Sequence, residues 1–279
     1  MLTETAIAGV RARLADRRVD GARVALVPTM GALHDGHLAL VDTAKKAADV
    51  VVVSVFVNPL QFGPTEDFAR YPRDLESDAA KLSQRGAAIL FAPSVGEMYG
   101  DGAHTTVMPA PFADVFEGAV RPGHFAGMLT VVAKLFNIVR PDVAVFGRKD
   151  LQQLALIRAM VGDLNFPVEV VAMDTVRERD GLALSSRNRY LDEQSRRRAT
   201  RIHAALVAAK AAFDSGVTDA AEIEASGRSV LARDGALDVG YFGLVREADF
   251  QRPSVAASGD SVVTAVRIGG TRLIDNILL

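Results

Sequence analysis

The sequence contains no cysteine, which excludes disulfide bridges and thiolate metal sites and agrees with a reducing compartment. It also lacks any uninterrupted apolar run of about 18 residues, so no membrane span is predicted, although hydrophobic residues make up 49% of the chain. The first residues alternate apolar and charged side chains at helical spacing, unlike a secretory signal. We therefore expect a soluble, cytoplasmic protein with no membrane partner.

The sequence also has no excess of positive charge. The formal net charge is −2 and the isoelectric point is near 6.2, so a nucleic acid would have to bind a local basic patch. The candidate patch is Arg196-Arg197-Arg198, in a stretch with helical periodicity. A solvated helix face is the simpler interpretation, and we expect no nucleic-acid partner.

Short β-branched runs alternate with amphipathic segments through the first 175 residues. Strands are predicted at residues 23–27, 50–57, 88–91, 142–146 and 167–172, with helices at 37–48, 74–85, 125–139 and 150–161. This alternation predicts an α/β fold with a doubly wound, Rossmann-like parallel sheet.

The pattern changes after residue 175. Long helices are predicted at 192–215 and 221–233, followed by strands at 238–245, 261–267 and 271–278, with a hairpin turn at Gly269-Gly270. We expect two domains: residues 1–175 as a nucleotide-binding domain, and residues 176–279 as a smaller C-terminal α+β lid domain.

The most informative segment, PTMGALHDGH at residues 28–37, lies between the first sheet strand and a helix, at the edge where such sheets bind ligands. It matches neither a P-loop nor a dinucleotide fingerprint. Gly31 and Gly36 permit a tight turn and a close backbone approach, and the helix start favours an anion. Imidazoles can donate hydrogen bonds to phosphate near neutral pH, so His34 and His37 are predicted to bind nucleotide phosphates.

Other interpretations of the histidine pair remain open at this point. An isolated H-x-x-H can be half of a zinc site or two surface histidines. The flanking glycines, the preceding strand and the lack of a convincing third metal ligand favour the phosphate interpretation. A second cationic group follows a later strand in GRKD, where Lys149 is predicted to contact ATP phosphates and Asp150 to cap a helix.

Several motifs resemble those of the pantothenate synthetase family, in that family's order. His-Asp-Gly-His is similar to the His-Ile-Gly-His signature of class I aminoacyl-tRNA synthetases and nucleotidyltransferases. The more specific resemblance is carried by residues 28–37, SVFVNPLQF at 54–62, RPGHF at 121–125, FGRKDLQQL at 146–154 and LSSRN at 184–188.

The resemblance implies an AMP-forming acid–amine ligase that condenses pantoate with β-alanine through a pantoyl-adenylate, with ATP as substrate, Mg²⁺ bound with ATP, and a homodimeric assembly. His34, His37 and Lys149 are the expected catalytic residues, and Asn58, Gln61 and Gln153 are the expected pantoate-binding residues. The expected ATP-binding residues are Met30, Gly31, Ala32, Leu33, His34, Asp35, Gly36, His37, Gly147, Arg148, Lys149, Asp150, Val176, Leu184, Ser185, Ser186 and Arg187.

The sequence departs from the family pattern at four positions: Leu184, Leu151, Met128 and Arg148. The first three conserve apolar volume, whereas Arg148 adds a second cation beside Lys149. Asp74, Glu76 and Asp78 include a candidate magnesium ligand, although acidic residues are also common in a first helical turn. The rival functions are a nucleotidyltransferase that leaves a nucleotide on its product and a nucleotide-binding regulator without turnover.

Overall fold

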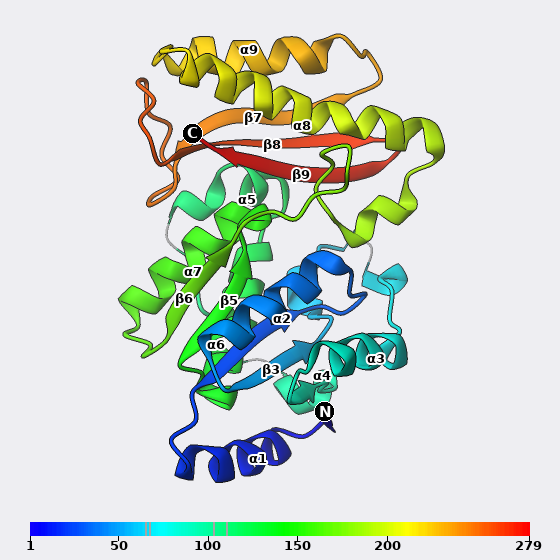
Figure 1. Ribbon diagram of the computed structural model, residues 1–279, viewed down its shortest axis with the longest axis vertical. Helices are drawn as coiled ribbons and strands as arrows, with labels where there is room; N and C mark the ends of the chain where they lie inside the picture. The colour runs from blue at the N-terminus through cyan, green and yellow to red at the C-terminus, as the bar shows by residue number, and fades with distance from the viewer. Residues whose placement is uncertain (65, 67, 103, 110) are drawn as a thin grey trace. The chain divides into compact units, whose positions relative to one another are not determined.

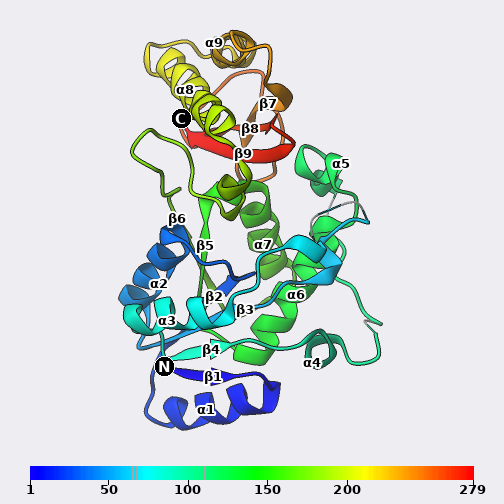
Figure 2. The same ribbon diagram turned by 90° about the vertical axis from the view of Figure 1, so that its right-hand side faces the viewer.

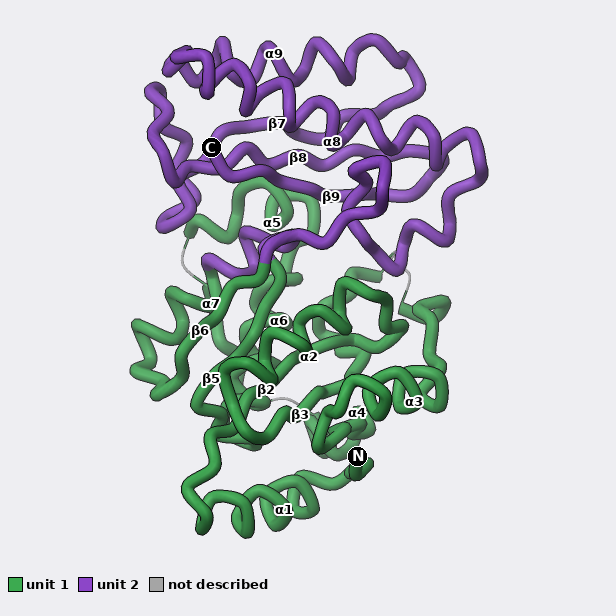
Figure 3. The backbone as a smooth tube through the Cα atoms, in the orientation of Figure 1, with its two compact units in different colours: residues 1–147, 156–173 green, residues 148–155, 174–279 purple. Residues whose placement is uncertain are grey.

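The computed structural model describes residues 1–64, 66, 68–102, 104–109 and 111–279 (Figure 1). The chain forms two compact units, which Figure 3 shows in different colours. The first unit contains residues 1–147 and 156–173, and the second contains residues 148–155 and 174–279. The expected division into a domain of residues 1–175 and a lid of residues 176–279 stays a prediction.

The first unit is built on a six-stranded parallel sheet with the strand order β1-β4-β3-β2-β5-β6. Its strands are β1 (Leu2–Glu4), β2 (Val24–Thr29), β3 (Val50–Val55), β4 (Ile89–Phe91), β5 (Val143–Gly147) and β6 (Glu169–Met173). The predicted doubly wound sheet is therefore confirmed.

Both faces of the central strands are buried, which explains their nearly continuous apolar sequences. Ala25 and Val27 of β2 pack in one cluster with residues of the helices α2 (Asp35–Ala47) and α3 (Leu75–Arg85). The alternate residues Val24 and Leu26 are also fully buried. Figure 2 shows α2 and α3 on one side of the sheet and α6 (His124–Val139) on the other.

Further helices complete the first unit. They are α1 (Ile7–Val19), α4 (Val95–Tyr99), α5 (Glu117–Val120) and the 3-10 helices η1 (Pro59–Gln61), η2 (Phe68–Arg70) and η3 (Pro111–Asp114). Helix α7 (Leu151–Asp163) begins in the second unit and ends in the first. Strand β1 was not predicted from the sequence, because two of its three residues are exposed and it is defined by its pairing with β4.

The second unit contains a three-stranded antiparallel sheet with two helices packed along it (Figure 1). Its elements are the 3-10 helices η4 (Arg148–Asp150) and η5 (Ser186–Tyr190), α8 (Glu193–Asp214), α9 (Ala220–Ala232), β7 (Asp238–Arg246), β8 (Asp260–Ile268) and β9 (Thr271–Leu278). Gly269 and Gly270 both have positive φ, at 53° and 80°, in the predicted hairpin turn. The predicted α+β arrangement is confirmed.

Candidate functional site

The turn between β2 and α2 has an unusual backbone. Gly31 has φ of 80° and Ala32 has φ of 52°, so two successive residues have a left-handed backbone conformation. A Cβ on Gly31 would lie 2.9 Å from Cγ1 of Val55 and 3.0 Å from Oδ2 of Asp78, which leaves room only for glycine. Gly36, in contrast, lies within the first turn of α2. The tight turn predicted from the glycines therefore depends on Gly31.

The carboxylate of Asp78 holds this turn in place from α3. Its Oδ2 accepts a hydrogen bond from the backbone N–H of Ala32 at 2.9 Å, and its Oδ1 accepts one from that of Leu33 at 2.8 Å. Asp78 is only 1% exposed, and the Lys81 ammonium donates to the carbonyl oxygen of Leu33 at 2.9 Å. Hydrogen bonds to an ionised acceptor are among the stronger ones, so Asp78 stabilises the left-handed backbone. The two N–H groups are thereby already used within the protein.

Two of the three acidic candidates at the start of α3, Asp74 and Asp78, have structural roles. Asp74 is the N-cap of α3, and its side chain accepts from the backbone N–H of Ser77 at 3.0 Å. Asp78 contacts the turn between β2 and α2 instead of presenting its oxygens to solvent. Within the described part of the chain, no group of three or more His, Asp or Glu side chains could hold a metal ion.

His34 and His37 lie together at the start of α2. Their rings are stacked with centroids 4.0 Å apart and an interplanar angle of 29°. His34 is the N-cap residue, and the two side chains form a reciprocal capping box with each other's backbone N–H groups. The backbone N–H of His34 donates to Nδ1 of His37 at 3.4 Å, so the neutral ring of His37 carries its proton on Nε2. The two predicted histidines therefore lie together at the start of one helix.

A second group of polar residues follows β3, at the same edge of the parallel sheet. Asn58 is fully buried, and its Nδ2 donates to Oε1 of Gln61 and to the carbonyl oxygen of Gly127, both at 3.0 Å. Its Oδ1 accepts from the backbone N–H of Leu60 at 3.2 Å and from the hydroxyl of Tyr99 at 2.8 Å. Asn58 thus makes four hydrogen bonds within the protein and orients the Gln61 amide.

Burial raises the pKa of Tyr99 to about 12, although its hydrogen bond to Asn58 acts in the opposite direction. The hydroxyl therefore remains protonated at neutral pH and can keep donating to Asn58. Nothing in the local sequence connects these two residues, since 41 positions separate them.

Arg121 and His124 fix the backbone of Gln61. Arg121 donates to both carboxylate oxygens of Glu66, at 2.6 and 2.7 Å, and to the carbonyl oxygen of Gln61 at 3.1 Å. Nδ1 of His124 lies 2.8 Å from that same carbonyl oxygen, which can only accept, so the proton is on Nδ1. Nε2 of His124 can then accept from Arg121 at 3.0 Å. Both residues belong to the predicted motif at 121–125, and both support a predicted pantoate-binding residue.

The charge balance around Glu66 favours its ionised form. Its burial raises the pKa, but the hydrogen bonds and positive charge of Arg121 outweigh this and hold the pKa below its ordinary value. The Glu66–Arg121 pair therefore remains ionic at neutral pH.

In the second unit, η4 continues directly from the end of β5. Lys149 has a side chain 21% exposed, with Nζ 3.7 Å from Oδ2 of Asp150. Arg148 forms a close ion pair with Glu247, and its Nε lies 3.7 Å from Oδ1 of Asp174. The additional cation noted in the sequence is thus neutralised locally. Gln153 is half-buried near the start of α7.

The segment containing the predicted Ser-Ser-Arg site begins from a small hairpin. Arg177 and Ala183 form an antiparallel bridge, and the backbone N–H of Leu184 donates to the carbonyl oxygen of Val176 at 3.0 Å. Ser185 then caps η5, with its Oγ accepting from the backbone N–H of Arg187 at 3.3 Å. The hydroxyls and the guanidinium of this segment are therefore presented by a defined helix start.

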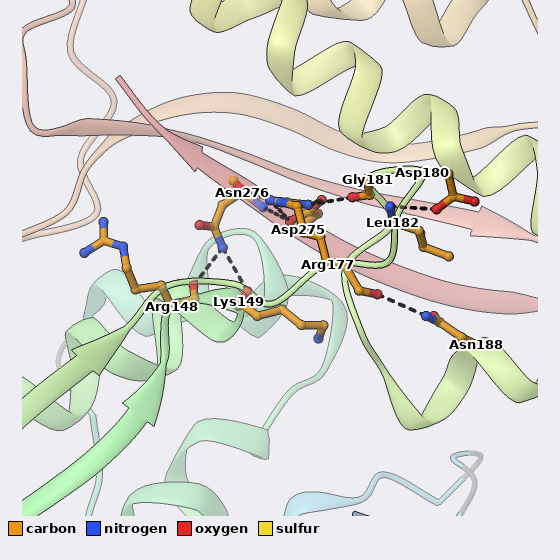
Figure 4. Close-up of polar contacts among 10 residues, drawn as sticks. Arg148, Lys149, Arg177, Asp180, Gly181, Leu182, Asn188, Asp275 and Asn276 are labelled. Carbon is orange, nitrogen blue, oxygen red and sulfur yellow. Dashed lines mark hydrogen bonds and ion pairs between the residues drawn. The ribbon is translucent and has the colours of Figure 1, made fainter. Parts of the chain in front are cut away.

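Figure 4 shows a further residue of the second unit that the sequence analysis did not single out. The side-chain amide of Asn276 donates to the carbonyl oxygens of Arg148 and Lys149, at 2.8 and 2.9 Å. The carboxylate of the preceding residue, Asp275, accepts hydrogen bonds from both terminal nitrogens of Arg177, at 2.6 and 2.9 Å. An Asp-Asn pair in a predicted strand carries no motif signal, so only the fold reveals these contacts.

Comparisons with known proteins identify relatives along nearly the whole chain. The family model described as pantoate–β-alanine ligase matches residues 3–278. Pantothenate synthetase of Mycolicibacterium smegmatis is 54% identical over 263 residues, covering 94% of this chain and 82% of the relative. That of Acidothermus cellulolyticus is 53% identical over 258 residues, covering 91% and 84%.

Solved structures are similar over the full length. Pantothenate synthetase from Thermus thermophilus has a TM-score of 0.95 and 47% identity, with 100% of this chain and 99% of that chain covered. Pantoate–β-alanine ligase from Francisella tularensis, complexed with βγ ATP and β-alanine, has a TM-score of 0.81 and 33% identity, with 100% and 97% covered.

Proposed function

The chain belongs to the pantoate–β-alanine ligase family, and we propose that it condenses (R)-pantoate with β-alanine in an ATP-dependent reaction to form pantothenate, AMP and diphosphate. The observation that carries this conclusion is the family match over residues 3–278. The imidazole pair at the strand-to-helix turn supports it, because this arrangement suits a nucleotide phosphate.

The first chemical step forms a pantoyl-adenylate. A carboxylate oxygen of pantoate attacks the α-phosphorus of ATP, the new oxygen–phosphorus bond forms, and the bond to the departing diphosphate breaks. We propose that His34, His37 and Lys149 act on the phosphates of ATP. They reduce the repulsion between two anionic substrates and stabilise the charge that moves onto the diphosphate.

The second step uses the bound intermediate directly. The neutral amine of β-alanine attacks the acyl carbon, AMP leaves, and the amine proton is lost as pantothenate forms. No covalent enzyme intermediate is required. We further propose that the residues from Leu184 to Arg187 contact the β- and γ-phosphates, and that closure of this segment protects the labile adenylate from water.

Gln61 and Gln153 are the proposed pantoate-binding residues. The hydrogen bond from Asn58 to Oε1 of Gln61 fixes the orientation of this amide, in which its Nε2 hydrogens can donate to a ligand. Since Asn58 is fully buried with four hydrogen bonds inside the protein, we propose that it acts on pantoate through Gln61.

The remaining proposals concern the setting of the reaction. Mg²⁺ enters with ATP and is held largely by phosphate and water oxygens. The enzyme acts as a cytoplasmic homodimer without nucleic-acid or membrane partners. Arg196 pairs with Glu178 and Asp180, which supports the absence of a nucleic-acid site. Within the described residues, no helix is both long and apolar enough to cross a membrane.

The decisive test is AMP release from ATP, pantoate and Mg²⁺, with β-alanine present or omitted. We expect stoichiometric pantothenate and AMP with β-alanine, and enzyme-bound pantoyl-adenylate in a single turnover without it. A nucleotidyltransferase would leave the nucleotide on its product, and a regulator would show no turnover, so either result contradicts the proposal.

Two variants test the assigned residues within the same assay. His37→Ala and Lys149→Ala should each lower kcat by about 10²–10³, the usual effect of removing one well-placed donor to a developing negative charge. The matched controls are His104→Ala, an exposed histidine, and Lys210→Ala, a lysine paired with Asp214 on α8. Both controls should retain the wild-type rate.

A further inference from the structure

Two consecutive polar residues lie buried in β9 of the second unit. Asp275 is 3% exposed and Asn276 is 5% exposed, in a strand whose flanking residues, Ile274 and Ile277, are apolar. Burying a carboxylate and an amide is costly unless each is hydrogen-bonded. Their partners therefore indicate what these side chains contribute.

The partners of Asn276 lie in the segment that carries Lys149. Nδ2 of Asn276 donates to the carbonyl oxygen of Arg148 at 2.8 Å and to that of Lys149 at 2.9 Å (Figure 4). Both hydrogens of the amide are thus used on successive carbonyl groups of η4. They fix the peptide planes on either side of the Lys149 Cα, and so the direction in which its side chain leaves the backbone.

The partners of Asp275 lie in the hairpin that precedes Ser185. Arg177 donates to both carboxylate oxygens of Asp275 in a fork geometry, to the carbonyl oxygen of Asn276 at 3.1 Å and to that of Gly181 at 3.1 Å. Such a planar, two-point pair fixes orientation as well as distance. Two adjacent residues of β9 therefore contact the backbone of η4 and the hairpin before Ser185, which lead into two segments that are proposed to bind ATP.

We propose that Asn276 is a positioning residue for Lys149, and that the adjacent Asp275–Arg177 pair fixes the start of the Ser185–Arg187 segment in the same way. This inference rests on the proposed function. An ammonium contributes to a phosphoryl-transfer transition state only when it is correctly placed, and a displacement of about 1 Å can lower a rate about 10²-fold. Asn276 acts through Lys149 and does not itself contact the substrate.

The test is a double-mutant cycle between Asn276→Ala and Lys149→Ala, with kcat and the KM for ATP measured by AMP release. In the wild-type background, Asn276→Ala should lower kcat/KM for ATP by about 10–100-fold, mostly through kcat. In the Lys149→Ala background the same substitution should change the rate by less than about 3-fold, because the group it positions is absent.

A matched control separates positioning from general destabilisation. Thr264, on the neighbouring strand β8, is fully buried, and its hydroxyl donates to the carbonyl oxygen of Tyr241 at 2.9 Å. Thr264→Val removes this buried hydrogen bond to β7 and changes neither Asn276 nor Lys149, so it should leave kcat/KM within about 3-fold of wild type. Thermal unfolding of every variant identifies the assay temperature at which all are folded.

Graded variants keep the test informative if Asn276→Ala does not fold. Asn276→Ser can donate one hydrogen bond and should lose less activity, whereas Asn276→Asp faces two carbonyl oxygens with a carboxylate and should lose more. Equal losses in the two Lys149 backgrounds, or wild-type kinetics for both graded variants, would overturn the inference. Failure of the wild-type enzyme to release AMP, or a fully active Lys149→Ala, would instead contradict the proposed function.

Discussion

Replacing Asp78 by asparagine should weaken the turn between β2 and α2 from a position outside it. The substitution preserves size but replaces one carboxylate oxygen with an NH2 group. Both oxygens of Asp78 accept backbone N–H groups in the structure, at 2.9 and 2.8 Å, so one N–H would then face a donor. The other bond would persist with a neutral acceptor.

The expected magnitude follows from these two contacts. A hydrogen bond to a charged group contributes about 1.5–3 kcal/mol, and a buried donor without an acceptor costs about 1–3 kcal/mol. Since Asp78 is 1% exposed, water cannot easily replace the lost partner. We expect Asp78→Asn to lower the free energy of unfolding by about 2–4 kcal/mol, and the loosened left-handed turn to lower kcat/KM for ATP by about 10–100-fold.

Urea unfolding and AMP release measure the two effects separately. The control is Asp74→Ala, which removes the N-cap of the same helix and should cost about 1 kcal/mol of stability without changing the kinetics for ATP. Asp78→Asn with a wild-type kcat/KM and an unfolding free energy within about 0.5 kcal/mol of wild type would refute the role assigned to this carboxylate.

Two further predictions concern the partly buried titratable residues Tyr99 and His203. Tyr99→Phe removes the hydrogen bond to Asn58. It should raise the KM for pantoate about 3–10-fold, with little change in the KM for ATP. Equal changes in both constants would contradict the proposed orientation of the pantoate site. Burial and the charge of Arg177 lower the pKa of His203 below 6.5, while Asp275 opposes this shift. The unfolded chain therefore binds this proton more tightly than the folded chain. The free energy of unfolding should fall as the pH drops below 6.5. His203→Gln should flatten that part of the profile in urea unfolding from about pH 5.5 to 7.5, and an unchanged slope would show that another group is responsible.

The central fold was predictable because its pattern is local. Strands such as β3 are runs of β-branched residues buried on both faces, and the intervening helices repeat their apolar residues at helical spacing. Strand β1 was not predicted because it lacks a buried apolar run and is defined by its pairing with β4. The inclusion of residues 148–155 in the second unit is likewise a matter of tertiary contact, which periodicity does not encode.

In the candidate site, too, contacts between residues close in sequence were predictable, whereas contacts between distant residues were not. His34 and His37 lie three positions apart on one helix start, so their association followed from the sequence. Asp78 contacts the turn from 45 positions away, and Asn276 contacts Lys149 from 127 positions away. Residues that bind a substrate through a short motif can be found by inspection, whereas residues that hold such a motif in place come from wherever the fold brings them.

The restraint of Gln61 has a consequence for ligand selectivity. A glutamine amide can normally present either its NH2 donor or its oxygen acceptor to a ligand, because it can rotate by about 180° about its last side-chain bond. Here Asn58 donates to Oε1, and that partnership disfavours the flipped rotamer. If Gln61 binds pantoate as proposed, its fixed amide favours a ligand atom that accepts a hydrogen bond, so a pantoate analogue with an ammonium group at that position should bind more weakly.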